Sequence, residues 1–355
     1  MSRRHMDNKC SMYEGLAALC ADGPAGLEGH VQALYAPEIQ VRAAHPINEG
    51  RGYDFLLDSV WMPLLTAFPD LERRDLIVMG GAYEGREYVA MMGHYCGTFR
   101  ADWLTIPATG RPIYLRYGEV HELRDGRIVQ TNCLWDVLDV IRQAGFWPIA
   151  PSLGTEGMWP GPLTADGLLL SPQDPGQSQT SLAQTLAMHD TLAAFSDRDG
   201  GGREALLAMP QRDHWHPRMM WYGPSGIGTT RGLQGFVDYH QLPFRTAFPG
   251  RKGGGQWDEI ADLKAQRGGG HYIRLGDGPY SVTGGWPSVF AMHEGPDFLG
   301  VGATGRPVTM RVMDFYLHHE GLIRENWVPL DVLDLLLQMG VDVLARSQSL
   351  FRRGQ

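Results

Sequence analysis

The chain has 355 residues, of which 43% are hydrophobic and ten are tryptophan, so it can bury two sizeable cores. Its formal net charge of −9 argues against a nucleic-acid partner, which would require a basic face. The four cysteines show no metal-ligand spacing and all lie in the first half, so we expect reduced thiols and a cytoplasmic location. No run of 18 apolar residues occurs, so we expect no membrane partner. No apolar segment follows the arginines near the N-terminus, so we expect no signal peptide.

The first half predicts helices followed by strands. Apolar residues at helical spacing predict a helix over 53–68, ended by Pro69. Runs rich in β-branched and aromatic residues predict strands at 76–79, 88–99, 113–123 and 128–134. Asp125-Gly126 predicts a hairpin turn, and Asp136 is expected to cap a short helix over 137–143. This order is typical of an α+β domain with helices packed on one face of a curved sheet.

Residues 148–181 form a Pro-rich connector between the two halves. Its apolar residues favour packing against the halves over a free linker. Ser181 is a plausible N-cap for a helix over 182–195.

The second half repeats the first. Thr109–Gly145 matches Thr304–Gly340 at a constant offset of 195, with 13 of 37 positions identical, and 51–69 matches 231–249 at an offset of 180. The second copy therefore carries 15 additional residues, and its glycine runs at 253–255 and 268–270 mark their expected place. We infer two domains, 1–147 with an N-terminal extension and 182–355, joined by the connector.

The repeated block resembles the SnoaL-like polyketide cyclase family. The resemblance lies in Pro-Ala-Thr-Gly-Arg-Pro at 107–112, Asp-Gly-Arg-Ile-Val at 125–129 and Trp-Asp-Val-Leu at 135–138. That family belongs to the nuclear-transport-factor-2-like superfamily, which implies two tandem cone-shaped α+β domains, each a curved antiparallel sheet wrapped around packed helices. It also implies a pseudo-twofold dimer within one chain, with a further homodimer as an open possibility.

The resemblance implies acid/base chemistry without a cofactor, in which a pocket aspartate closes a polyketide ester by an aldol reaction. The aspartate's position is Cys133 in the first half and Val328 in the second, and neither can replace a carboxylate. The position of the family's pocket histidine is Glu119 in the first half and Asp314 in the second. The acid/base group has therefore moved by one strand or been lost.

Glu119 and Asp314 are the candidate catalytic bases. Strand alternation places Tyr117, Glu119 and His121 on one face, which the alignment makes the cone interior. Burial in an apolar cone raises the pKa of a carboxylate towards neutrality, as a general base requires. His121 or Tyr316 would then hydrogen-bond the enolate oxygen. In the alternative, each carboxylate pairs with Arg116 or Arg311, or with a hydroxyl, in a structural network.

We expect the ligand to be a small apolar carbonyl compound, bound without a metal or cofactor. The residues expected to contact it are His45, Tyr95, Tyr117, Cys133, Trp221, Tyr222, Tyr316 and Trp327. Two functions are compatible with these residues: a cyclase- or isomerase-type enzyme, or a binding or assembly protein without catalysis. In a third, asymmetric reading, motivated by the Gly-rich insertion, one half is active and the other is structural.

Overall fold

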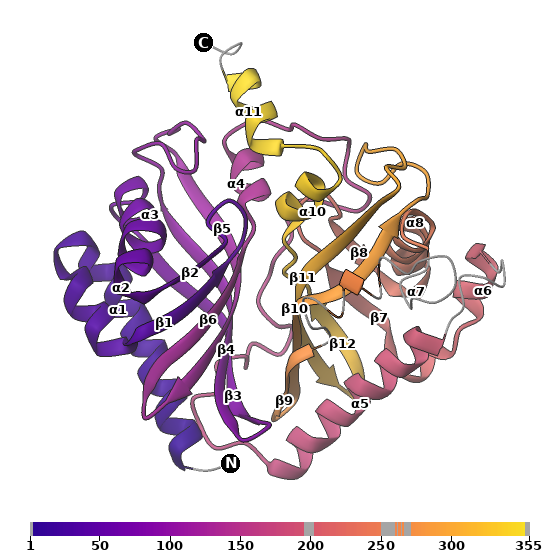
Figure 1. Cartoon of the computed structure of the whole chain (residues 1–355). Helices are drawn as coiled ribbons and strands as arrows, with labels where there is room; N and C mark the ends of the chain where they lie inside the picture. The colour runs from indigo at the N-terminus through magenta and orange to yellow at the C-terminus, as the bar shows by residue number, and fades with distance from the viewer. Residues whose placement is uncertain are drawn as a thin grey trace. The chain divides into compact units, whose positions relative to one another are not determined.

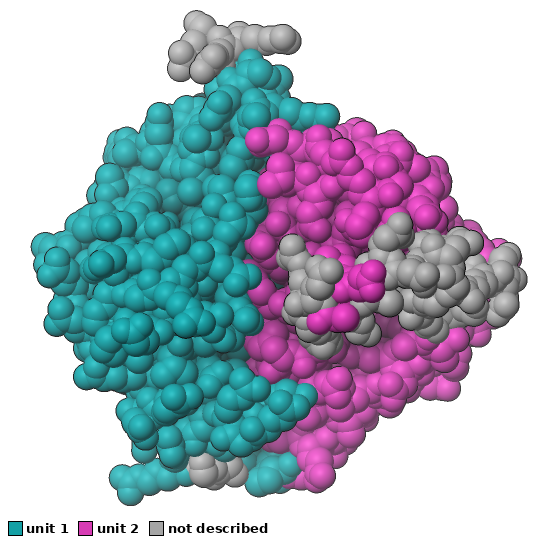
Figure 2. Space-filling model, viewed as in Figure 1, with its two compact units in different colours: residues 1–148, 160–175, 343–355 teal, residues 149–159, 176–342 magenta. Residues whose placement is uncertain are grey.

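The computed structural model describes residues 3–194, 202–249, 260, 262–263, 265 and 271–351. The chain forms two compact units (Figure 2). The first comprises Met1–Pro148, Pro160–Pro175 and Val343–Gln355, and the second comprises Ile149–Trp159 and Gly176–Asp342. The glycine runs at 253–255 and 268–270, on which the asymmetric reading rested, lie outside the described residues.

The first unit has one six-stranded sheet, in the order β2-β1-β6-β5-β4-β3. Its elements are α1 (Arg3–Leu34), β1 (Tyr35–Ala43), β2 (Glu49–Arg51), α2 (Gly52–Phe55), η1 (Leu56–Trp61), α3 (Met62–Ala67), β3 (Glu72–Tyr83), β4 (Arg86–Thr98), β5 (Pro112–Arg124), β6 (Arg127–Trp135), α4 (Val137–Gln143) and α11 (Val343–Phe351). Helices α1 and α3 lie on one face of this sheet (Figure 1).

The second unit repeats this plan, with the sheet order β8-β7-β12-β11-β10-β9. Its elements are α5 (Pro175–Ala194), α6 (Gly202–Ala208), η3 (Pro210–Asp213), β7 (Trp215–Tyr222), β8 (Thr229–Arg231), α7 (Gly232–Phe236), η4 (Val237–Gln241), α8 (Leu242–Ala247), β9 (His271–Asp277), β10 (Tyr280–His293), β11 (Arg306–His319), β12 (Leu322–Trp327) and α10 (Val332–Gln338). The prediction of two tandem α+β domains is confirmed. In the described part of the chain, no helix combines the length and apolar content needed to cross a bilayer.

The sequence had predicted antiparallel sheets, but each sheet contains one parallel pair of strands. The first strand of each unit pairs in parallel with the last, β1 with β6 and β7 with β12, whereas the other neighbouring pairs are antiparallel. Parallel pairing requires a long crossover, and here the crossover consists of the helices and strands between the first and last strands of the unit.

Local sequence signals placed most of the turns and caps. Asp125 and Gly126 both have positive φ, 51° and 78°, and join β5 to β6 as a tight hairpin. Asp136 and Asp331 each accept a hydrogen bond from the backbone N–H three residues later and cap α4 and α10. Ser181 is not an N-cap, because α5 begins at Pro175, and its hydroxyl instead donates to the carbonyl oxygen of Gly278 at 2.9 Å.

The predicted helix over 53–68 is present but not uniform. The π-helical segment η1 interrupts it, and η4 interrupts the corresponding helix of the second unit. A π-turn accommodates one more residue than an α-helical turn. Both segments lie where the two copies align at an offset of 180, so the duplicated domains share this irregularity.

Candidate active site in the second unit

The two candidate carboxylates occupy the same position of the repeat but have different surroundings. Glu119 on β5 and Asp314 on β11 are 195 positions apart, and each lies on the inner face of its sheet. Glu119 is 2% exposed. Asp314 is partly exposed, and it lines a cavity.

Glu119 is held in a network of charged and polar side chains. Its Oε2 lies 2.7 Å from Nη1 of Arg73, and its Oε1 accepts hydrogen bonds from Tyr95 at 2.8 Å and from Trp135 at 2.9 Å. Burial favours the neutral acid, but the Arg73 charge, the His121 imidazole 3.5 Å away and the hydrogen bond from Trp135 outweigh it and hold the pKa of Glu119 well below its usual value. The expectation of a raised pKa at Glu119 is therefore wrong. The structural alternative required an arginine beside Glu119, and one is present, but it is Arg73 on β3.

The arginine expected to pair with Glu119 has another role. Arg116 lies 2.7 Å from Asp139 in α4, and so joins β5 to the closing helix. In the second unit, Arg311 lies 3.1 Å from Asp331 and not beside Asp314.

The expected ligand-binding residues of the first unit lie in its packed interior. Tyr95 and Tyr117 are at most 1% exposed, with ring centroids 4.8 Å apart, and the Arg73 guanidinium lies 4.3 Å from the Tyr117 ring. Burial raises the pKa of the Cys133 thiol, so this group remains protonated rather than nucleophilic. His45 follows β1 in the connection to β2 and is half-buried.

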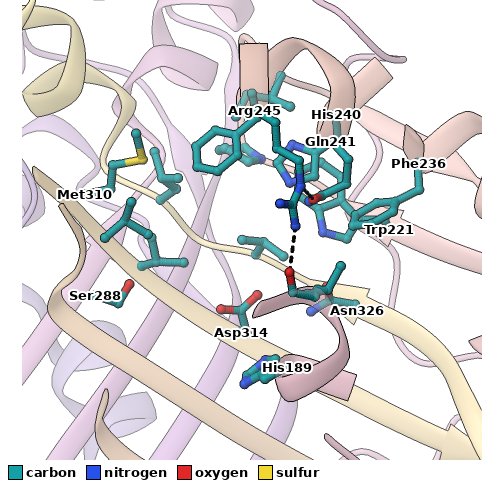
Figure 3. Close-up of a pocket in the computed structure, with 18 of the residues that line it drawn as sticks. His189, Trp221, Phe236, His240, Gln241, Arg245, Ser288, Met310, Asp314 and Asn326 are labelled. Carbon is teal, nitrogen blue, oxygen red and sulfur yellow. Dashed lines mark hydrogen bonds between the residues drawn. The ribbon is translucent and has the colours of Figure 1, made fainter. Parts of the chain in front are cut away.

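The second unit contains a cavity of about 720 Å³ (Figure 3). Most of its lining is apolar or aromatic, with a few polar groups, as is common in small-molecule sites. Asp314, Tyr316 and Asn326 lie on the strands, and His189 comes from α5. Trp221, Phe236, His240, Gln241 and Arg245 line it from β7, α7, η4 and α8.

The cavity occurs where the second copy carries smaller side chains than the first. Aromatic residues that fill the interior of the first unit have smaller counterparts at the repeat offsets and at the matched strand positions. These pairs are Tyr117 and Val312, Trp135 and Leu330, Trp61 and Gln241, and Tyr95 and Val289. All four smaller residues line the cavity. Losing aromatic volume from a close-packed interior opens space that neighbouring side chains fill only in part.

Asp314 has the electrostatic properties expected of a general base. Desolvation by burial outweighs the opposing effects of Asn326 and Tyr316, and the net result raises its pKa from 3.8 to about 7. Among the residues that the structure describes, no arginine or lysine forms an ion pair with it. The pKa expected of the catalytic carboxylate is thus found in the second unit alone.

Tyr316 connects Asp314 to helix α5. Its hydroxyl lies 2.9 Å from Nε2 of His189. Burial and the neighbouring Asp314 raise the pKa of Tyr316 well above its usual value, so the phenol is protonated. Tyr316 can therefore serve as a hydrogen-bond donor beside the carboxylate.

Aromatic rings form another part of the cavity wall. The His240 imidazole stacks on the Trp221 indole at 4.0 Å with an interplanar angle of 18°, and Phe236 contacts both rings (Figure 3). The Arg245 guanidinium donates to Oε1 of Gln241 at 2.9 Å and to the carbonyl oxygen of Leu192 at 3.0 Å. Flat apolar surfaces of this kind suit a planar hydrophobic ligand.

Two residues expected to contact the ligand do not line this cavity. Tyr222 and Trp327 stack on each other at 5.3 Å, and the Tyr222 hydroxyl donates to Glu325 at 2.9 Å. Each is adjacent in sequence to a cavity residue, Trp221 or Asn326, and alternation along the strand therefore turns it to the opposite face of the sheet.

Sequence reasoning did not identify His189, His240 or Arg245. For two of them a signal was available in the repeat, because His240 and Arg245 replace Val60 and Leu65 at the offset of 180. A polar residue at a buried apolar position of a duplicated helix marks a change of role. His189 lies outside the aligned blocks, so the repeat gave no such signal for it.

Comparisons with known proteins match the first unit to a family. Residues 26–144 match the model of the SnoaL-like polyketide cyclase family. No curated protein matches the chain.

Solved structures match about 40% of the chain and nearly their own whole length. A protein from Jannaschia sp. CCS1, provisionally assigned as a SnoaL-like polyketide cyclase, is 19% identical, with 40% of this chain and 93% of that chain covered and a TM-score of 0.33. TsrD from Streptomyces laurentii is 20% identical, with 41% and 98% covered and a TM-score of 0.33. An NTF2-like protein of unknown function from Burkholderia pseudomallei is 16% identical, with 41% and 100% covered and a TM-score of 0.31. Residues 26–144 are thus similar to the SnoaL-like polyketide cyclase family, and the second unit repeats the strand order of the first.

Proposed function

We propose that the second unit carries out cofactor-free acid/base chemistry on a small apolar carbonyl compound, with Asp314 as the base. The observation that carries this proposal is a carboxylate whose pKa is raised to about 7 in a largely apolar cavity of about 720 Å³. A base with this pKa is half ionised near neutrality and has a greater driving force for proton transfer than an aspartate of ordinary pKa. We assign the first unit a structural role, because an arginine neutralises its carboxylate.

In the proposed reaction, ionised Asp314 removes a proton from the carbon next to the carbonyl group. The electron pair of the broken C–H bond moves to the carbonyl oxygen and forms an enolate, which Tyr316 stabilises by donating a hydrogen bond. In an aldol cyclisation the enolate carbon attacks a second carbonyl of the same molecule, and the new alkoxide recovers the proton from Asp314. In an isomerisation the proton returns to a different carbon.

The lining of the cavity supports an apolar substrate with a flat body. The stacked Trp221 and His240 rings and Phe236 provide a surface that a planar ligand can cover. An aromatic polyketide ester, a steroid or a cyclic ketone has both this shape and a carbonyl group. Burying such a ligand would release water from apolar surface and so favour binding.

A second candidate function is binding without catalysis. It is favoured by the residues at the position where the resemblance places the family's aspartate, which are Cys133 and Val328. In that case Asp314 would only hydrogen-bond a polar group of the ligand.

Proton exchange separates the two candidates without requiring the natural substrate. A panel of cyclic ketones and aromatic polyketide esters is incubated with the protein in D₂O, and the loss of the α-proton signal is followed by ¹H NMR. We expect accelerated exchange with the wild type and a loss of about 100-fold or more with Asp314→Asn. Glu325→Gln is the matched control, because this buried carboxylate lies one residue from Asn326 but binds Tyr222 outside the cavity. Binding of a panel compound without any exchange would favour the second candidate, and equal exchange by Asp314→Asn and wild type would refute the role of Asp314.

A further inference from the structure

His189 contacts Tyr316, the proposed enolate-stabilising residue, but has no role in the mechanism as stated. It comes from α5 and lines the same cavity (Figure 3). Its Nε2 lies 2.9 Å from the Tyr316 hydroxyl. Its ring also packs edge-on against Tyr316, with centroids 5.9 Å apart at 64°. An edge contact together with a hydrogen bond fixes the position of the phenol relative to the helix.

The His189 ring is neutral at physiological pH. Burial, helped by the neighbouring His271 and Arg274, lowers its pKa to about 4. The His271 ring stacks on it at 5.4 Å with an interplanar angle of 14°, and burial also lowers the pKa of His271 to about 4. A neutral imidazole carries one N–H, so Nε2 of His189 is either a donor or an acceptor.

The number of available protons decides which it is. The Tyr316 hydroxyl has one hydrogen, and ionised Asp314 can only accept. Asp314 and Tyr316 lie two positions apart on β11, so both side chains face the cavity, and the phenol is placed to donate its hydrogen to the carboxylate. The Tyr316 oxygen is then left as an acceptor, and Nε2 of His189 must supply the hydrogen for the 2.9 Å contact.

We propose that His189 is a positioning residue that holds Tyr316 through an Nε2–H donor and so prepares the phenol to stabilise the enolate. The inference rests on the proposed function of Asp314. When Asp314 takes up the substrate proton, it no longer needs the hydrogen bond from Tyr316, and the phenol can turn its hydrogen to the new enolate oxygen. The donation from His189 makes the phenol a stronger donor at that moment.

The tautomer of His189 tests the inference in the wild-type protein, independently of any reaction. Proton-detected ¹⁵N NMR at pH 8, where Asp314 is ionised, should show the hydrogen on Nε2. A hydrogen on Nδ1 would overturn the proposal. The readout does not depend on the exchange assay, so failure of the proposed function and failure of the His189 assignment can be told apart.

Two variants test the effect on the reaction. His189→Leu removes the donor, and we expect kcat for α-proton exchange to fall about fivefold, as for the loss of one hydrogen bond to a neutral group, with KM little changed. His189→Gln retains an N–H donor on a side chain of similar reach and should recover much of this loss. Tyrosine labelled at ¹³Cζ, with the Tyr316 signal assigned from Tyr316→Phe, should show a shifted Tyr316 signal in the leucine variant. An unchanged signal together with an unchanged rate in His189→Leu would overturn the assignment.

Discussion

Replacing Asp314 with asparagine should stabilise the protein at alkaline pH. Asparagine keeps the shape of the side chain and a hydrogen-bond acceptor for Tyr316, but it carries no charge in the cavity. The wild-type carboxylate is ionised above pH 7 in surroundings that disfavour its charge, because burial raises its pKa from 3.8 to about 7. Asp314→Asn therefore removes an unfavourable charge from the folded state.

The magnitude follows from the same pKa values. Each pKa unit corresponds to about 1.4 kcal/mol, so the difference between 3.8 and about 7 corresponds to at most about 4 kcal/mol in the free energy of unfolding. Between these values the folded protein binds a proton that the unfolded chain has lost. The contribution of Asp314 to stability therefore falls as pH rises from 3.8 to about 7 and stays constant above it.

Urea unfolding followed by tryptophan fluorescence measures this difference across pH. We expect Asp314→Asn to be more stable than the wild type at pH 8 and the gap to close as pH falls towards 4. Glu119→Gln is the comparison with the opposite sign, because Arg73 holds the pKa of Glu119 below its usual value, and this variant should lose stability at neutral pH. A pH-independent difference for Asp314→Asn, or a less stable variant at pH 8, would refute the account of its environment.

Two further predictions concern the contrast between the units. Arg73→Met should destabilise the first unit by about 3–5 kcal/mol, because Glu119 and Asp75 would remain as buried charges without their partner. Urea unfolding measures this loss of stability, and a loss under about 1 kcal/mol would contradict the prediction. Val312→Tyr restores in the second unit the residue that fills the first, and should abolish the thermal shift given by a ketone active in the exchange assay. Val312→Ile is the control for this variant, and circular dichroism verifies that both fold. A thermal shift retained in Val312→Tyr would show that the ligand binds elsewhere.

Local chemistry made most of the fold predictable from the sequence. The Asp125-Gly126 hairpin and the Asp136 cap depend on residues within a few positions of each other, and both were found as expected. The constant repeat offsets predicted two domains of one fold. The parallel pairing of the first and last strands was missed, because it joins segments about ninety residues apart in the first unit and more than one hundred apart in the second, and neither carries a local signal.

The candidate site was predictable only in part, because its electrostatics depend on contacts between distant strands. Strand alternation placed Glu119 and Asp314 on inner faces, but which arginine meets Glu119 depends on sheet register, and it proved to be Arg73 on β3 and not the neighbouring Arg116. The difference in pKa between the two carboxylates follows from that contact. By contrast, the Tyr117-to-Val312 and Trp135-to-Leu330 differences lie within the aligned repeat, so the sequence alone could have indicated which unit contains the cavity.

The shared π-turn lets this helix hold one more residue without losing its orientation. A π-turn takes up one residue more than an α-helical turn, so the turns on either side stay in register. Both copies have the π-helical segment at aligned positions, although the two segments differ at most positions. In the second unit this segment supplies His240 and Gln241 to the cavity wall. Substitution at these two positions can therefore change which ligand fits without moving Phe244 and Arg245, which follow in α8.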